Sequence, residues 1–377
     1  MIPWLPSVLQ CAQCSRPLDE RQGGFGCRAC GQHYPRVGRV PVLLPHPEDH
    51  VRLWRQQLAA VIAQGEYTRA ALDGEFEHAA QLQCGPSRLR ALQQALRQQL
   101  ADIAAVVSPA LGGPLAAADS NRLPRGVVEY SHFCYRDWAW ETAGNTENRR
   151  AHQAVRAVLG EAPLGRLLVL GAGACRLAYD LHRAPGASET VALDIDPFLL
   201  LIAESVLRGE SVHLTEATAN VQELNQVAQR WELCAPGGPL HEREFQCLLA
   251  DGLAPPFADG SFDTVLAPWF IDQVPADLPG LLSQIHRVLR PMGRLIHTGP
   301  LLFPAVTPFS SRYCREEVFE LLARAGFELG AWATETHEHL VSPLTGRGRV
   351  EWVLTFEARA VVGSAARHER SADPLGK

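Results

Sequence analysis

From residue 166 onward, apolar strands alternate with helices, and this alternation limits the fold more than any other feature of the 377-residue chain. RLLVLGAGAC runs from a strand into a glycine-rich turn, and ACRLAYDLHRA continues as a helix. TVALDIDP, FQCLLADG and SFDTVLAPWFIDQV supply further strands, and a closing helix, strand and strand unit follows residue 314. Such a pattern predicts an α/β, Rossmann-like fold with a doubly wound parallel sheet.

The glycine turn and two aspartates predict a nucleoside-containing ligand. Gly171 and Gly173 let the backbone approach a ligand closely. Asp194 ends the second strand, where a carboxylate can accept both ribose hydroxyls, and Asp251 ends the third, where it can meet an adenine amino group. A dinucleotide would also explain a bare GxG turn, but the third glycine of GxGxxG is replaced by Arg176.

Near the N-terminus, Cys11, Cys14, Cys27 and Cys30 form two CxxC pairs separated by twelve residues. This spacing delivers four thiolates to a tetrahedral site, so it predicts a zinc ribbon whose closed Zn²⁺ site has a structural role. Disulfide pairing is the alternative. The remaining six cysteines lack ligand spacing and are expected to be buried small hydrophobes.

Composition along the chain predicts four segments: a zinc ribbon over residues 1–50, a helical linker or cap over 51–126, the α/β domain over 127–362 and a flexible tail over 363–377. Two amphipathic helices with a break near Cys84 account for the cap. The net charge of −6, the lack of a signal-like start and the lack of a long apolar run predict a cytoplasmic protein without membrane contact.

Four segments together resemble the class I S-adenosylmethionine-dependent methyltransferases: LVLGAGACRLAYDL, VALDIDP, LLADGLAPPFADGSFDTV and LRPMGRLIHTG. The resemblance covers about residues 127 to 360 and implies a seven-stranded sheet and S-adenosylmethionine as cofactor. It also implies that the cofactor contacts the glycine turn, the residues after the second strand and those after the third: Gly171, Gly173, Asp194, Ile195, Asp251 and Gly252.

Within that superfamily, CYRDWAWETAGNTENRR, WFIDQV and HTGPLLF resemble the carnosine N-methyltransferase family, which methylates an imidazole nitrogen. The resemblance implies that Arg136 helps to hold the cofactor and that Asp272 faces the substrate as the catalytic residue. Departures lie on the substrate side, where Pro304 replaces a histidine and residues 348–350 replace a tyrosine run. The resemblance therefore does not extend to the identity of the substrate.

Alternatives accompany these assignments. Trp269 and Phe270 are expected to wall the substrate pocket, with Tyr135 as a further substrate-binding candidate. Tyr135 and Trp138 are also candidates to face the sulfonium, although core packing is favoured over that role for both. Arg136 and Asp137 would otherwise form a surface ion pair, and Asp272 a helix N-cap. His297 is a weaker catalytic candidate, and a structural role is favoured for it.

The ribbon segment, LQCAQCSRPLDERQGGFGCRACGQHYPRVGRVPVLLP, resembles the small zinc-ribbon activators of tRNA, rRNA and translation-factor methyltransferases. Three functions stay open. The first is N-methylation of a small molecule, peptide or protein side chain. The second is base methylation of tRNA or rRNA, against which the dispersed basic residues argue. The third is a non-catalytic scaffold that binds the cofactor. Oligomeric state is not predicted.

Overall fold

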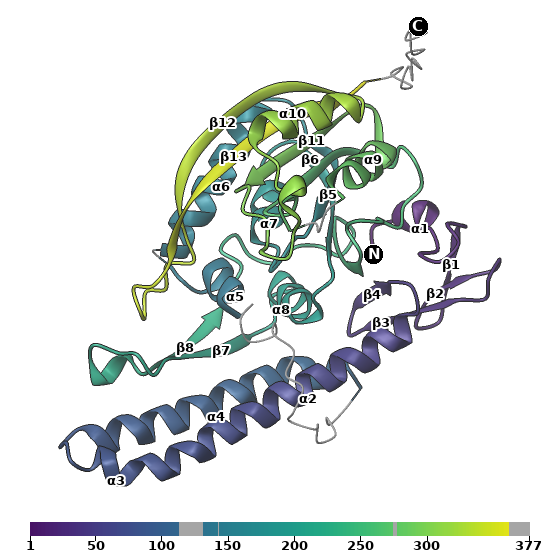
Figure 1. The fold of residues 1–377 in the computed structure, drawn as a ribbon. Coiled ribbons are helices and arrows are strands. Elements are labelled where there is room, and N and C mark those ends of the chain that lie inside the picture. Colours follow the sequence, from purple (N-terminus) through teal and green to yellow (C-terminus); the bar gives the residue numbers. More distant parts are fainter. Residues whose placement is uncertain (113–130, 142, 274–276, 362–377) are drawn as a thin grey trace, which may run out of the picture.

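The computed structural model describes residues 1–112, 131–141, 143–273 and 277–361, and a large twisted sheet organises them (Figure 1). Seven of its strands follow the order β9-β6-β5-β10-β11-β13-β12. The first five of these are mutually parallel, and β13 is antiparallel to both of its neighbours. The predicted doubly wound, seven-stranded α/β fold is therefore confirmed. The strands are β5 (Gly165–Leu170), β6 (Ala187–Asp194), β9 (Phe245–Ala250), β10 (Phe262–Pro268), β11 (Leu289–Gly299), β12 (Phe327–His339) and β13 (Arg349–Ala360).

The central strands of this sheet are buried on both faces, and the side chains along each of them alternate between two hydrophobic cores. In β5, Leu167 and Val169 enter one hydrophobic core, whereas Leu168 and Leu170 enter the other. Helices α5 (Ser131–Trp138), α6 (Ala143–Leu159), α7 (Arg176–Arg183) and α8 (Pro197–Leu207) contribute to the first core. Helices α9 (Leu278–Val288) and α10 (Arg315–Arg324) contribute to the second.

The N-terminal segment continues the same sheet. After helix α1 (Leu5–Val8), strands β1 (Leu18–Arg21), β2 (Gly24–Cys27), β3 (His33–Val37) and β4 (Val40–Leu43) pair antiparallel in sequence order. Strand β4 then pairs parallel with β9, so that Val42 lies opposite Leu249 and Leu43 opposite Ala250. The result is one eleven-stranded sheet. The sequence predicted a closing strand here but not its union with the main sheet.

Two long helices, α2 (Pro47–Ala71) and α4 (Gly85–Ala110), lie side by side along one flank (Figure 1). The short helices η1 (Leu72–Glu75) and α3 (Phe76–Ala79) connect them, so the predicted break near Cys84 is confirmed. Leu58 of α2 and Leu89 and Ile103 of α4 are buried, whereas Leu53 is 47% exposed. No described helix has the length and apolar character needed to span a membrane. The division into domains stays a prediction, and the tail beyond residue 361 lies outside the described residues.

An antiparallel hairpin of β7 (Val212–Ala217) and β8 (Ala228–Leu233) was not predicted. It carries the short helix η2 (Leu224–Gln226) and packs against α4. Asp102 of α4 is buried and accepts hydrogen bonds from the Thr215 hydroxyl at 2.6 Å and from the Arg230 guanidinium at 3.0 Å. Another short helix, η3 (Phe309–Ser311), follows β11.

Candidate functional site

The glycine turn after β5 is shaped by backbone conformations that favour glycine. Gly171 and Gly173 have φ values of +63° and +56°. The Gly173 N–H donates to the Asp194 carboxylate at 2.8 Å, and the Asp196 N–H donates to its other oxygen at 2.9 Å. Burial raises the pKa of Asp194 to about 6. A Cβ placed on Gly173 would meet no atom within 4 Å, so the turn is open on that side.

Phe270 lies between this turn and the end of β9. A Cβ on Gly171 would come within 2.4 Å of the Phe270 ring, and a Cβ on Gly252 within 2.5 Å. Asp251, beside Gly252, accepts a hydrogen bond from the Leu253 N–H at 2.8 Å. Because β9, β6 and β5 are parallel neighbours, their carboxyl ends meet at one edge of the sheet. The residues predicted to contact the cofactor gather at that edge: Gly171, Gly173, Asp194, Ile195, Asp251 and Gly252.

Asp272 follows β10 and is 1% exposed. Its Oδ2 accepts a hydrogen bond from the Leu302 N–H at 3.1 Å, whereas Oδ1 is buried with no hydrogen-bond partner among the described residues. Burial raises the pKa of this carboxyl to about 6. Asp272 is not the N-cap of α9, because Asp277 caps that helix by accepting from the Gly280 N–H. Asp272 is thus a buried carboxyl group with spare hydrogen-bonding capacity.

Trp269 lies at the end of β10 with a φ of +46°, a backbone conformation that residues other than glycine rarely adopt. Its indole N–H donates to Glu351 of β13 at 2.8 Å, and its ring stacks on His339 of β12 with centroids 5.5 Å apart. The His339 Nδ1 lies 3.0 Å from Glu147 of α6. Sequence reasoning missed His339, Glu351 and Glu147. The signal for Glu351 was a glutamate at the start of an apolar run, EWVLTF.

Arg136 is held by two carboxylates. Its Nε donates to Asp137 at 2.6 Å and its Nη1 to Glu147 at 3.1 Å. The ion pair with Asp137 therefore exists, but it is not on the surface, since the two side chains are 15% and 2% exposed. Removing either carboxylate would leave the buried cation with one of its two partners.

The two aromatic residues beside Arg136 pack in the core. Tyr135 is 2% exposed, and its hydroxyl donates to the Thr215 carbonyl of β7 at 2.8 Å. The Trp138 indole donates to the Ala174 carbonyl at 2.8 Å. The hydroxyl of Tyr135 is committed to the unpredicted hairpin, which fits the core packing that sequence reasoning favoured for this residue.

His297 of β11 is fully buried, and its Nδ1 lies 2.8 Å from the Ala267 carbonyl. Burial lowers its pKa to about 4, so the ring is neutral at physiological pH. Both observations fit the structural histidine that sequence reasoning favoured.

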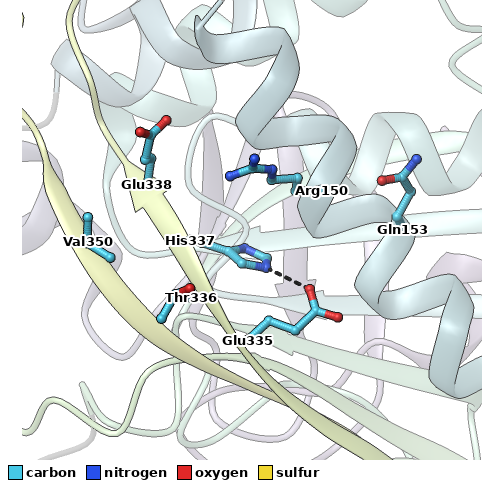
Figure 2. A pocket seen from close by; sticks show the side chains of 7 residues that line it. All are labelled: Arg150, Gln153, Glu335, Thr336, His337, Glu338 and Val350. Atoms are coloured by element: carbon cyan, nitrogen blue, oxygen red, sulfur yellow. Dashed lines mark hydrogen bonds and ion pairs between the residues drawn. The ribbon is translucent and has the colours of Figure 1, made fainter.

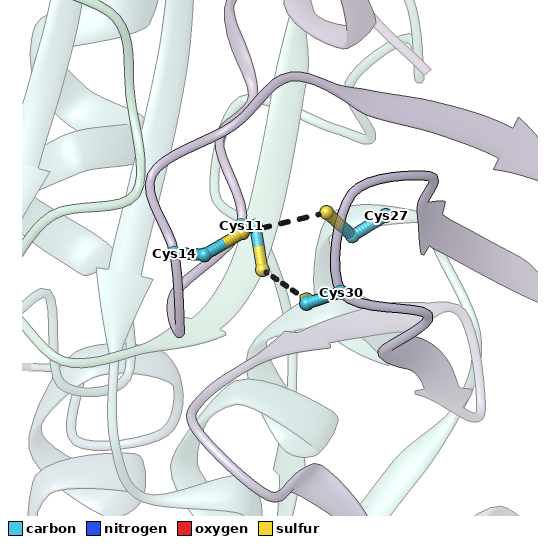
Figure 3. Close-up of side chains that lie close together, drawn as sticks. All are labelled: Cys11, Cys14, Cys27 and Cys30. Carbon is cyan, nitrogen blue, oxygen red and sulfur yellow. Dashed lines mark hydrogen bonds between the residues drawn. The ribbon is translucent and has the colours of Figure 1, made fainter.

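The four N-terminal cysteines converge (Figure 3). Sulfur atoms of Cys11 and Cys30 are 3.6 Å apart, as are those of Cys14 and Cys27, and all four lie within 4.8 Å of one another. A disulfide would need a separation of about 2.05 Å. Four Zn–S bonds of about 2.3 Å in a tetrahedron would separate the sulfurs by about 3.8 Å. The buried Tyr34 hydroxyl lies 3.0 Å from the Cys11 sulfur.

Comparison with known proteins identifies the α/β region. The family model described as a methyltransferase domain matches residues 168–297. No curated protein matches the chain.

Among solved structures, a putative methyltransferase (BH2331) from Bacillus halodurans is 15% identical to this chain. The match covers 58% of this chain and 100% of that protein, with a TM-score of 0.39. The N-methyltransferase NodS from Bradyrhizobium japonicum, in complex with S-adenosyl-L-homocysteine, is 13% identical over 57% of this chain and 87% of its own, with a TM-score of 0.37. A chain from the complex of the Haloferax volcanii Trm112 methyltransferase activator with a putative methyltransferase is 14% identical over 63% of this chain and 97% of its own, with a TM-score of 0.41.

The matched segment, residues 168–297, begins within β5 and ends within β11, so it contains the glycine turn, Asp194, Asp251 and Asp272. The domain match and the sheet order agree on the same class of protein. The chain is therefore an S-adenosylmethionine-dependent methyltransferase.

Proposed function

We propose that this enzyme methylates a nitrogen atom of a small molecule, a peptide or a protein side chain, and that an imidazole nitrogen suits the site. The observation that carries the proposal is the Asp272 carboxyl group, which is buried and lies just beyond β10, and whose Oδ1 has no hydrogen-bond partner among the residues that the structure describes. A buried acceptor without a donor is costly unless a ligand supplies one. An N–H of the substrate meets that need.

The residues around the glycine turn suit the adenosyl part of the cofactor. In this proposal the open side of Gly173 receives the cofactor, Asp194 accepts its ribose hydroxyls, and Ile195, Asp251 and Gly252 line the adenine. The side chain of Ile195 is 54% exposed and so is available to cover a ring. Arg136 would lie at the methionine end, with its orientation fixed by Asp137 and Glu147.

The chemistry then requires alignment more than covalent assistance. The bound cofactor supplies an electrophilic methyl group on a sulfonium. The residues of the site would orient the substrate nitrogen so that its lone pair points at that methyl group, and a proton would leave the nitrogenous group. Asp272 would accept the N–H on the far side of the nucleophile and so stabilise the positive charge that develops there. Trp269 and Phe270 would wall the pocket.

Incubation of a cell extract with the enzyme and a cofactor labelled on its methyl group tests this proposal. We expect label in the small-molecule or protein fraction, and none when the Asp272→Asn variant replaces the enzyme. Label in RNA would overturn the proposal in favour of the tRNA or rRNA alternative. No transfer to any fraction, despite tight cofactor binding, would favour a scaffold function.

We further infer that Cys11, Cys14, Cys27 and Cys30 hold one structural Zn²⁺ ion per chain. The 3.6 Å sulfur separations support this, as does the Tyr34 hydroxyl, which would donate to a thiolate of the site. Four protein ligands leave no open coordination position, so the ion would stabilise the fold without taking part in catalysis. Elemental analysis of purified protein, with about one zinc per chain expected, tests this inference.

A further inference from the structure

A cavity of about 600 Å³ lies between α6 and β12, and none of the residues assigned above to methyl transfer lines it (Figure 2). Its walls come from Arg150 and Gln153 of α6 and from four consecutive residues of β12, Glu335 to Glu338. It is therefore a second recess in the molecule, separate from the carboxyl edge of the sheet.

The buried wall of this cavity contains an unsatisfied hydrogen-bond acceptor. His337 is 2% exposed, and its Nε2 lies 3.4 Å from the Glu335 carboxylate. In the neutral ring, the hydrogen on Nε2 faces that carboxylate, and Nδ1 keeps a free lone pair. Nδ1 is buried and has no hydrogen-bond partner among the described residues. A ligand with an N–H group would satisfy it.

Charges around the cavity favour a cationic group. Glu335 and Glu338 are exposed acceptors, and within the described part of the chain neither forms an ion pair with arginine. Arg150 is the one arginine or lysine in the lining, and it forms no ion pair with any described residue. Two carboxylates therefore face one guanidinium, so the charged groups of the lining have a negative balance. An ammonium or guanidinium fits the acceptors, and Arg150 remains free to donate to a carbonyl oxygen.

The strand that forms the cavity also has an open edge. Strand β12 is the last strand of the eleven-stranded sheet, so its other edge has no strand partner among the described residues. Residues 334, 335, 336 and 338 are all exposed. On neighbouring β13, Val350 and Trp352 are 67% and 72% exposed. An unpaired edge beside a side-chain pocket and exposed apolar groups suits an extended polypeptide that adds as a strand.

We propose that the β12 edge and its cavity bind an extended, basic segment of a polypeptide. The main chain of that segment pairs with β12, and one lysine or arginine side chain enters the cavity to meet His337, Glu335 and Glu338. Arg150 donates to a carbonyl of the segment. The binding does not depend on methyl transfer, so it stands or falls separately from the proposed reaction.

Fluorescence anisotropy with the full-length, zinc-loaded protein tests this proposal. The probe is a labelled twelve-residue peptide with lysine alternating with threonine and valine, and the comparison peptide has glutamate in place of each lysine. We expect only the lysine peptide to bind, with an affinity that falls as salt increases. We expect the double variant Glu335→Gln, Glu338→Gln to bind about five- to tenfold more weakly. Both side chains are exposed, so this variant should fold.

Glu328→Gln supplies the matched control, because Glu328 is an exposed glutamate on the same strand outside the cavity. Its affinity for the lysine peptide should equal that of the unchanged protein. Equal loss in the control and the double variant, or no loss in either, would overturn the proposal. Nα-acetyl-lysine methylamide should bind far more weakly than the peptide. Equal affinity would show that the cavity takes a free amine rather than a polypeptide. Peptide-induced protection of β12 amides in hydrogen exchange would support the strand pairing.

Discussion

Replacing Asp272 with asparagine removes a buried negative charge while keeping the shape of the side chain and an oxygen that can accept from the Leu302 N–H. Burial raises the pKa of the carboxyl from 3.8 to about 6. At about 1.4 kcal/mol per pKa unit, holding this group ionised in the fold costs about 3 kcal/mol. The cost is large enough to require a compensating use, and the proposed reaction supplies one.

The sign of this effect makes stability a readout. Because the folded-state pKa lies above the unfolded value, the folded protein binds more protons between pH 4 and pH 6. Its stability should therefore fall as the pH rises through that window and then level off. Asp272→Asn abolishes this contribution, so the variant should be as stable as the parent at pH 8, or more stable by up to about 3 kcal/mol. Thermal unfolding at pH 5 and pH 8 measures the difference.

Catalysis should change in the opposite direction. We expect Asp272→Asn to bind the cofactor normally and to lower kcat by at least about a hundredfold. In the parent protein, kcat should rise with pH through about 6, as the carboxyl ionises, and the variant should lack that inflection. Asp194 has a pKa of about 6 as well, so the profile must be measured with saturating cofactor.

Asp277→Asn is the matched control, since it makes the same chemical change five residues away at the N-cap of α9. Asparagine caps helices about as well as aspartate, so stability and turnover should stay unchanged. Full turnover by Asp272→Asn would refute the assigned role. A persistent inflection near pH 6 at saturating cofactor would assign the titration to another group.

Three further changes test the site and the cysteine cluster. Asp194→Ala should weaken cofactor binding by about 1 to 3 kcal/mol in isothermal titration, because the ribose loses a charged acceptor; an unchanged affinity would contradict that contact. Gly252→Ala places a methyl group 2.5 Å from the Phe270 ring, so it should destabilise the protein by about 1 to 3 kcal/mol in thermal unfolding unless the ring can move. Cys30→Ser should lose zinc in elemental analysis and lower the melting temperature, and a variant that retains a full equivalent of metal would argue against the four-cysteine site.

The parts of the fold that sequence reasoning predicted depend on local patterns. Strands β5, β9 and β10 are short apolar runs. The glycine turn and Asp194 lie within about twenty-five residues of one another, so both are read from one segment. Asp251 and Asp272 follow two further strands, and the carboxyl ends of parallel strands meet at one edge of the sheet. Local patterns of this kind were enough to bring six cofactor candidates to one edge.

The residues that sequence reasoning missed depend on contacts between distant segments. Trp269 meets His339 and Glu351, which lie 70 or more positions later in the chain. Tyr135 bonds to Thr215 across 80 positions, in a hairpin whose strands are too polar and short to stand out. Nothing within a single segment indicates which buried polar group another segment will satisfy. Such pairs become visible only when the strands are placed side by side.

The union of β4 with β9 illustrates how a separate-looking module can become part of the catalytic fold. Val42 joins the hydrophobic core that contains Leu249, whereas Leu43 joins the core that contains Ala250. Without β4, the backbone edge of β9 would be unpaired, one residue before Asp251. The N-terminal segment therefore contributes to both cores and covers the edge of the strand that ends just before Asp251. If a metal ion stabilises that segment, its loss will reach this edge of the sheet through the β4–β9 pair and through the bridge between Leu9 and Phe257.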